Sequence, residues 1–232
     1  MSADAFKKQA AEAALLLVEP DMTLGLGTGS TAAHFITALR NHVRDGLYVR
    51  GVATSDDTAR KAAAAGIDVI EPDETTIIDL AVDGTDEVDG ALSLIKGGGG
   101  ALLREKIVAN AARRFVVIAD ASKKVAQLGN FPLPVEIDRF SFALTVRAVR
   151  EALQILDYAK ADIRLRAGPS GPAFLSDGGN FILDCALQRI DDARALDRTL
   201  KEIPGVIETG LFVGMAHDVI LAGPTGLERL AR

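Results

Sequence analysis

A short segment of this 232-residue chain, DGTDEVDGALSLIKGGGGALLREK over residues 83–106, gathers the residue types that proton transfer next to a carbonyl needs. It begins with the carboxylates Asp83 and Asp86 and continues to Lys96. Four consecutive glycines follow, and Glu105 lies in the first turns of the helix predicted after them. A glycine run that opens a helix exposes N–H groups at the positive end of the helix dipole, which favours an anion or a developing oxyanion. An ammonium group, N–H donors and a carboxylate base within one segment therefore favour proton abstraction next to a carbonyl.

The same segment also has a purely structural interpretation. Gly-rich turns and acidic loops are common on protein surfaces, and most Asp-x-x-Asp pairs are simply solvated. The segment alone leaves both interpretations open, and its combination with a second Gly-rich segment favours the catalytic one.

That second segment is the loop GLGTGST over residues 25–31, which follows a short apolar strand. The dinucleotide fingerprint G-x-G-x-x-G is not met, because its third glycine position holds Ser30, and the lysine of a P-loop is missing as well. A phosphate cradle at a helix N-terminus is the third interpretation, with hydroxyls from Thr28, Ser30 and Thr31 and a close backbone approach at Gly29. The alternative is a tight strand-to-helix turn with Ser30 or Thr31 as the N-cap. The loop alone leaves these two open.

Two lysines and the histidines complete the set of candidate residues. Lys123 follows a buried strand predicted to end at Ala119, so it lies at the carboxyl end of that strand, where parallel sheets bind ligands. A solvated pair with Lys124 is the simpler interpretation. Lys7 is a weaker candidate of the same kind. No metal site is expected, because the three histidines share no ligand spacing with one another or with the single cysteine: His34, His42, His217 and Cys185.

Composition excludes several classes of partner. The net charge is −6 and no basic run exceeds two residues, which argues against nucleic acid or an anionic membrane as the main partner. The single cysteine fits a reducing cytosol. The N-terminal segment lacks the layout of a signal peptide, and its apolar run is too short to span a bilayer. We therefore expect a cytoplasmic protein whose main partner is neither nucleic acid nor an anionic membrane.

Strands and helices alternate through the first half of the chain. This alternation predicts an α/β fold with a doubly wound, mostly parallel, Rossmann-like sheet, and both Gly-rich loops then follow the carboxyl ends of strands, where such sheets bind ligands. The expected strands are 22–26, 47–53, 68–70, 77–82 and 115–119, and the expected helices are 4–18, 32–44, 56–65 and 101–113.

A smaller α+β domain is expected after a boundary at Phe131–Pro134. Strands at 206–213 and 219–222 should rejoin the first sheet, so the expected bounds are 1–130 plus 207–232 for the Rossmann-like catalytic domain and 131–206 for the smaller one. Within the smaller domain we expect helices at 142–157 and 193–202 and strands at 163–166, 173–175 and 181–186. Asp56–Asp57 and Asp191–Asp192 are expected to cap the helices that follow them.

These motifs, in this order, resemble ribose-5-phosphate isomerase of the A type over nearly the whole chain. The likeness is carried by GLGTGSTAAHFI, TSDDTARKAAAAGI, LAVDGTDEVDGALSLIKGGGGALLREKIVA, VVIADASKKV, FPLPVEI and IPGVIETGLF. The resemblance implies a cofactor-free interconversion of D-ribose 5-phosphate and D-ribulose 5-phosphate in the non-oxidative pentose phosphate pathway. It also implies a homo-oligomer, usually a dimer and sometimes a tetramer.

The resemblance also implies roles for single residues. Glu105 matches the catalytic base of the family. The other matches are Thr28, Gly29, Ser30 and Thr31 in the TGST substrate loop, Asp83, Gly84, Thr85 and Asp86 in the DG-small-D segment, Lys96, Gly97, Gly98 and Gly99 in the KGGG segment, and Lys123 as a substrate-contacting lysine. The departures are Gly100, Leu103 and Thr54, where the family often has Ala, Thr and Ser, and none of them removes a group that the chemistry needs.

Two other functions on related folds stay open. A sugar-phosphate sensor would bind without converting its ligand; such proteins usually carry an appended DNA-binding segment, for which this chain has no room. An acyl or CoA transferase would use a glutamate nucleophile in a different context. The isomerase interpretation expects the turn near residue 30 and the Lys–Glu segment near residue 100 to hold opposite ends of one five-carbon sugar.

Overall fold

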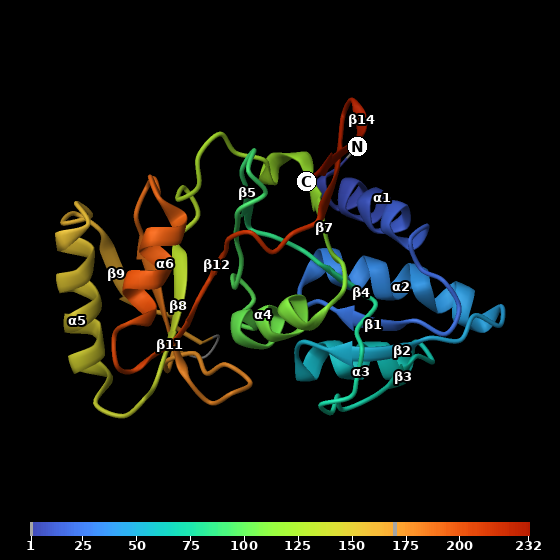
Figure 1. The fold of residues 1–232 in the computed structure, drawn as a ribbon, viewed down its shortest axis with the longest axis horizontal. Coiled ribbons are helices and arrows are strands. Elements are labelled where there is room, and N and C mark those ends of the chain that lie inside the picture. The colour runs from blue at the N-terminus through green and yellow to red at the C-terminus, as the bar shows by residue number, and fades with distance from the viewer. Residues whose placement is uncertain (1, 169–170) are drawn as a thin grey trace. The chain divides into compact units, whose positions relative to one another are not determined.

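The computed structural model describes residues 2–168 and 171–232, which divide into two compact units (Figure 1). The first unit comprises residues 2–85, 104–124 and 214–232, and the second comprises residues 86–103 and 125–213. Relative to the bounds expected from the sequence, residues 86–103, 125–130 and 207–213 group with the second unit. Antiparallel pairing contributes to this grouping, because β5 (Glu87–Val88) and β12 (Leu211–Phe212) both pair with β6 (Leu94–Ile95). The units reflect contacts alone, and the functional domain bounds stay a prediction.

The first unit is built on a seven-stranded sheet in the order β14-β13-β7-β4-β1-β2-β3. All neighbours in it are parallel except the C-terminal hairpin of β13 and β14. The predicted doubly wound, mostly parallel sheet is therefore confirmed. The strands are β1 (Thr23–Leu26), β2 (Arg50–Ala53), β3 (Asp68–Val69), β4 (Leu80–Asp83), β7 (Phe115–Asp120), β13 (Asp218–Gly223) and β14 (Gly226–Ala231).

The central strands are buried on both faces, which is why they read as unbroken apolar runs. Leu24 and Leu26 point into one core cluster, to which α1 and α2 contribute Ala10, Ala14 and Phe35. Gly25 faces the opposite side of β1, because side chains alternate along a strand, and Val108 of α4 lies close against it there. The helices of this unit are α1 (Ala3–Leu15), α2 (Ser30–Arg44) and α3 (Asp56–Ala64), together with α4 (Leu102–Ala111) from Arg104 onward.

The second unit contains a four-stranded antiparallel sheet in the order β11-β8-β10-β9 and the small sheet β12-β6-β5. Its core cluster combines residues of these strands with Val149 of α5 and Leu196 of α6. None of the helices in the described ranges is both long and apolar enough to cross a membrane. The remaining elements are β8 (Leu133–Ile137), α5 (Phe142–Ile155), β9 (Asp162–Leu165), β10 (Phe181–Ala186), α6 (Ala193–Lys201) and β11 (Val206–Thr209).

Two predictions about strands were wrong. The segment 206–213 does not rejoin the parallel sheet; it forms β11 and β12, which pair antiparallel with β8 and β6, whereas β13 does join that sheet. Residues 173–175 form no strand, and the only pairing there is a single bridge between Ala167 and Ala173. A short apolar segment shows strand propensity but not which partner it will meet.

The C-terminal hairpin is fixed to the parallel sheet by one carboxylate and two guanidinium groups. Arg114 donates from Nε and Nη2 to Asp218 Oδ2, at 2.9 and 2.7 Å. Arg229 donates in the same bidentate way to Oδ1, at 2.8 and 2.6 Å. Burial alone would raise the pKa of Asp218, but the hydrogen bonds from Arg114 and Arg229 lower it below its usual range.

The variant Asp218→Asn should therefore unfold more easily at neutral pH, by about 1–3 kcal/mol, because each arginine loses a charged acceptor. In the wild type the folded pKa lies below the unfolded value of about 3.9. The stabilisation by this carboxylate is therefore present above about pH 4 and is lost as the pH falls through the folded pKa. Urea titrations at pH 7 and near pH 3 should show that the difference in unfolding free energy between the two proteins narrows on acidification.

The matched control is Asp162→Asn, whose carboxylate pairs with Arg164 at 2.6 Å on the exposed surface. This variant should unfold within about 0.5 kcal/mol of the wild type at both pH values. Equal stability of Asp218→Asn and the wild type at pH 7 would contradict the role given to Asp218.

Candidate functional site

The candidate residues of the first unit lie at the point where the order of the parallel strands reverses. The chain runs from β1 outward through β2 and β3 on one side, and through β4, β7 and β13 on the other. The carboxyl ends of β1 and β4 are therefore neighbours whose following loops diverge, which is where open α/β sheets bind ligands. The segments after β1, β4 and β7 carry the predicted site residues 28–31, Gly84, Thr85 and Lys123.

Asp83, the last residue of β4, connects two of these loops. Its buried carboxylate accepts hydrogen bonds through Oδ1 from the N–H groups of Thr28, at 3.1 Å, and Gly84, at 2.7 Å. A Cβ on Gly27 would lie 2.1 Å from the same oxygen, so only glycine fits there. A Cβ on Gly84 would lie 3.6 Å from the Cβ of Thr31, which places the segment after β4 beside the start of α2. The structure thus brings together the two Gly-containing motifs that the sequence analysis paired.

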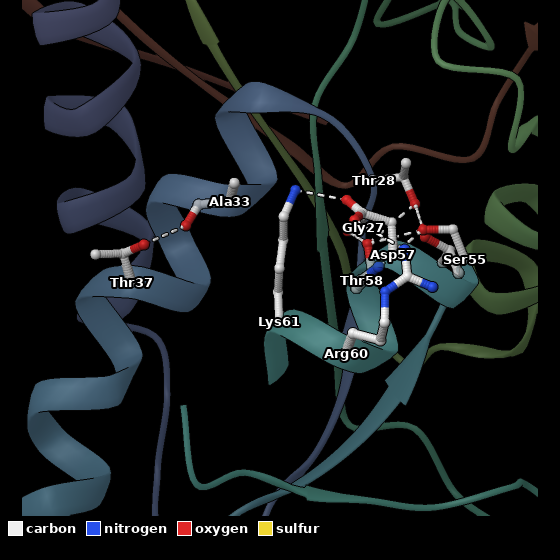
Figure 2. A network of polar contacts seen from close by, with 10 residues as sticks. Gly27, Thr28, Ala33, Thr37, Ser55, Asp57, Thr58, Arg60 and Lys61 are labelled. Atoms are coloured by element: carbon white, nitrogen blue, oxygen red, sulfur yellow. Dashed lines mark hydrogen bonds and ion pairs between the residues drawn. The ribbon is translucent and has the colours of Figure 1, made fainter. Parts of the chain in front are cut away.

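A cluster of four hydroxyl groups holds the loop after β1 (Figure 2). Thr28 Oγ1 lies 2.8 Å from Thr54 Oγ1 and 3.2 Å from Thr58 Oγ1, and it donates to Ser55 Oγ at 2.9 Å. Ser55 in turn donates to Thr58 at 3.0 Å. The cluster joins the end of β1 to the start of α3.

The backbone carbonyls of the loop accept the remaining hydroxyl protons. Thr54 donates to the carbonyl of Leu26 at 3.0 Å, and Thr58 donates to that of Gly27 at 2.9 Å. A hydroxyl has one proton, so the proton of Thr28 goes to another member of the cluster. Because its N–H is bonded to Asp83, both donors of Thr28 are engaged within this unit, and the residue shapes the loop.

The cap of α3 differs from the prediction. The N-cap is Ser55, whose Oγ accepts from the N–H of Thr58 at 3.1 Å, and Asp56 and Asp57 lie in the first turn. Asp57 pairs with Lys61 at 2.5 Å, and this bond lowers the pKa of its carboxyl group (Figure 2). In α6, by contrast, Asp192 caps the helix as predicted, because its side chain accepts from Ala195.

The N-terminus of α2 has no side-chain cap. Its N-cap is Gly29, whose φ of 100° is one that residues with a side chain rarely adopt, so neither Ser30 nor Thr31 is the N-cap that the alternative interpretation of this loop required. The hydroxyl of Ser30 instead accepts from Lys7 Nζ at 3.0 Å. The first turn of α2 therefore combines helix N–H groups, the hydroxyls of Ser30 and Thr31 and one ammonium group, a combination suited to phosphate.

Glu105 lies in the first turn of α4 and is only 5% exposed. It lines a narrow interior gap together with Gly27, Thr54 and Asp83, and this gap has no room for a water molecule. The predicted base therefore packs beside the loop after β1 and the carboxylate after β4, although these residues are far apart in the sequence.

Lys123 ends the short 3-10 helix η1 (Ala121–Lys123), which directly follows β7. Asp120 caps this turn, because its Oδ1 accepts from the N–H of Ser122 at 3.1 Å. Since β7 is the parallel neighbour of β4, Lys123 lies at the same edge of the sheet as Asp83.

The second unit carries the glycine run and its lysine. Lys96 is 2% exposed, its N–H donates to the carbonyl of Gly210 at 2.8 Å, and its Nζ lies 5.4 Å from the ring centroid of Phe212. Asp86 Oδ2 accepts from the N–H of Gly98 at 2.8 Å. The N–H of Gly100 closes a turn to the carbonyl of Gly97 at 2.9 Å.

The predicted site residues thus form two sets, each described within its own unit. The chain passes directly from Thr85 of the first set to Asp86 of the second. The first set comprises Thr28, Gly29, Ser30, Thr31, Asp83, Gly84, Thr85, Glu105 and Lys123, and the second comprises Asp86, Lys96, Gly97, Gly98 and Gly99.

The sequence analysis missed Ser55, Thr58 and Arg166 as parts of the site. Ser55 had a usable signal, because a serine directly before a helix is a typical N-cap. Arg166 had none: its guanidinium donates to the carbonyl of Gly97, 69 residues away, at 2.8 Å. Cys185 is a packing residue as expected; burial raises the pKa of its thiol to about 12.

Comparison with known proteins identifies the family of this chain. The family model described as Ribose 5-phosphate isomerase A (phosphoriboisomerase A) matches residues 50–226. Ribose-5-phosphate isomerase A of Rhodopseudomonas palustris strain BisB18 is 53% identical over 232 residues, which is 100% of each chain.

Solved structures match over the same length. A D-ribose-5-phosphate isomerase in complex with phospho-erythronic acid superposes with a TM-score of 0.92 at 39% identity over 100% of both chains. The ribose 5-phosphate isomerase A of Methanocaldococcus jannaschii superposes with a TM-score of 0.91 at 37% identity, again over 100% of both chains. This chain therefore belongs to the ribose 5-phosphate isomerase A family.

Proposed function

We propose that this protein interconverts D-ribose 5-phosphate and D-ribulose 5-phosphate, with Glu105 moving one proton between C2 and C1 through an enediolate. The single observation that carries the proposal is the position of Glu105, a nearly buried carboxylate that lies beside Gly27, Thr54 and Asp83. A buried carboxylate beside the ligand-binding edge of the sheet suits a general base. The membership of the family supports the substrate.

The second set of residues would stabilise the negative charge that develops on the substrate oxygen. Lys96 supplies a buried ammonium group, and the glycine run supplies N–H groups. One such donor is typically worth about 3 kcal/mol in the transition state. The N–H groups of Gly98 and Gly100 already bond to Asp86 and Gly97, so Gly97 and Gly99 carry the donors that would meet the oxyanion.

The two aspartates then have separable roles. Asp86 positions the glycine run, because its carboxylate accepts the N–H of Gly98. Asp83 uses Oδ1 for the loop after β1, and it would assist ring opening or move a proton between O1 and O2.

The phosphate would sit at the N-terminus of α2, away from the reacting carbons. There it would meet the N–H groups of the first turn, the hydroxyls of Ser30 and Thr31, and the ammonium groups of Lys7 and Lys123. The related structure with bound phospho-erythronic acid supports a phosphate site separate from the reacting carbons, because that ligand carries a carboxylate at one end and a phosphate group.

The proposal extends to the setting of the enzyme. We place it in the non-oxidative pentose phosphate pathway of the cytoplasm, as a homodimer or tetramer that needs no cofactor. Sedimentation of the purified protein would establish the oligomer size.

The variant Glu105→Gln should lose at least a hundredfold in kcat, because the amide cannot accept the substrate proton. The measurement is the formation of ketose from ribose 5-phosphate by the folded variant. Glu12→Gln, an exposed helical glutamate of the same unit, is the matched control and should keep wild-type turnover. If Glu105→Gln retains more than a few per cent of wild-type turnover, Glu105 is not the base. A wild-type protein that binds ribose 5-phosphate without converting it would be a sensor.

The variant Thr58→Val should raise KM for ribose 5-phosphate about tenfold while kcat changes less. It removes the donor to Gly27 and one partner of Thr28, so the loop after β1 loses its shape. Thr37→Val is the matched control, because Thr37 Oγ1 also donates to a backbone carbonyl, that of Ala33 at 2.8 Å, but on the exposed side of α2 (Figure 2). Equal KM values for the two variants would show that the hydroxyl cluster does not contribute to substrate binding.

The variant Lys7→Met should raise KM and weaken competitive inhibition by inorganic phosphate, each about tenfold, because a charge-assisted contact is lost. Lys8→Met changes the neighbouring lysine, which is exposed and lies 3.8 Å from Glu12, and it should behave like the wild type. Phosphate inhibition that is unchanged in Lys7→Met would exclude Lys7 from the phosphate site.

A further inference from the structure

The glycine run needs an external constraint to present its donors in one direction. Glycine loses more conformational freedom on folding than any other residue, so four in succession form an adaptable segment. Gly97 and Gly100 both have positive φ, at 101° and 84°. A loop that stabilises a transition state must be held close to its productive geometry before the substrate reaches it.

The constraint comes from Arg166, which directly follows β9. Its Nη1 donates to the carbonyl of Gly97 at 2.8 Å and to that of Gly98 at 3.2 Å. Its other edge is bound by Asp184 of β10, which accepts from Nε at 3.0 Å and from Nη2 at 2.5 Å. The side chain of Arg166 is 13% exposed, and its bonds to Gly97 and Asp184 are partly buried, whereas its bond to Gly98 lies on exposed backbone.

An aromatic ring completes the support. The guanidinium carbon of Arg166 lies 5.8 Å from the ring centroid of Phe174, within the range of a cation–π contact. A Cβ on Gly100 would lie 2.4 Å from the same ring, so Phe174 occupies the space beside the last glycine. All these residues belong to the second unit.

Because each peptide group is planar, a bond that fixes its carbonyl also fixes the direction of its N–H. The carbonyl of one residue and the N–H of the next share a rigid trans plane and point in opposite directions. The peptide between Gly97 and Gly98 is held at both ends, by Arg166 at its carbonyl and by Asp86 at its N–H. The next peptide is held by Arg166 at the Gly98 carbonyl, which sets the direction of the Gly99 N–H.

The Gly99 N–H forms none of the hydrogen bonds found within residues 2–168 and 171–232. A cation bonded to the carbonyl of a peptide also polarises that peptide, so its N–H becomes a stronger donor. Arg166 therefore orients and strengthens the same donor.

We propose that Arg166 is a positioning residue for the isomerisation: it aims the N–H of Gly99 at the oxyanion of the enediolate, and Asp184 and Phe174 hold it in place. This inference rests on the function proposed above. Arg166 touches the loop and not the substrate, so it should matter more for turnover than for binding of the ground state.

The test compares Arg166→Met and Asp184→Asn with Arg164→Met. Arg164 lies two residues earlier on β9, its side chain is 78% exposed, and it pairs only with the nearby Asp162 among the described residues. We expect kcat to fall about tenfold to a hundredfold in the first two variants, with KM within about threefold of the wild type. Arg164→Met should have the kcat of the wild type. Arg166→Lys should have a kcat between those of Arg166→Met and the wild type, because lysine keeps the positive charge but lacks the planar, bidentate guanidinium group.

Inhibitor binding separates positioning from a general loss of structure. Phospho-erythronic acid carries a carboxylate that can occupy the place of the enediolate oxygens. Its inhibition constant should rise by the same factor as kcat falls, whereas inhibition by inorganic phosphate should stay within about twofold of the wild type.

The outcomes also separate this inference from the proposed function. If the wild type does not convert ribose 5-phosphate, or if Glu105→Gln stays active, the proposed function fails. If both of those results are as expected and the Arg166 and Asp184 variants keep wild-type kcat, only the role of Arg166 is overturned. If Arg166→Met does not fold, Asp184→Asn and Arg166→Lys decide, and wild-type kcat in both overturns the inference.

Discussion

The carboxylate of Asp83 accepts hydrogen bonds from two backbone N–H groups, and the shape of the loop after β1 depends on this contact. A buried carboxylate is tolerated only when hydrogen bonds replace its lost water, and Thr28 and Gly84 provide them. The contact also requires a residue without a side chain at position 27. It lies where β1 and β4 adjoin, so it ties the loop after β1 to the end of the neighbouring strand.

Much of the first unit could be predicted from the sequence, because its signals are local. Apolar runs of strand length alternate with amphipathic helices, and this alternation specifies a parallel sheet before any partner is known. The fate of residues 206–213 could not be predicted in this way, since β11 and β12 join antiparallel sheets whose other strands lie far away in the chain. Pairing partners are a property of the folded chain, and periodicity does not encode them.

In the candidate site, too, local features could be predicted from the sequence and long-range contacts could not. Carboxylates, lysine and glycine runs are visible as residue types at characteristic spacing, so Glu105, Asp83 and the two Gly-rich loops could be named in advance. Several contacts that shape these loops join distant residues: Thr28 and Ser55 are 27 positions apart, and Arg166 and Gly97 are 69 positions apart. The sequence therefore predicts which groups can do chemistry, whereas the groups that aim them emerge only from the fold.

The two aspartates of the Asp-x-x-Asp segment bind different Gly-rich loops. Each aspartate accepts an N–H from one Gly-rich loop: Asp83 from Thr28 in the first unit, and Asp86 from Gly98 in the second. An asparagine could keep an acceptor oxygen at either place, but it would lose the charge that strengthens the bond and would add two donors needing partners of their own. Because each carboxylate engages one particular N–H, it also determines which donors of its loop stay available to a substrate. The two loops are rich in conformationally free glycines, and the bonds to Asp83 and Asp86 still hold each loop in one shape.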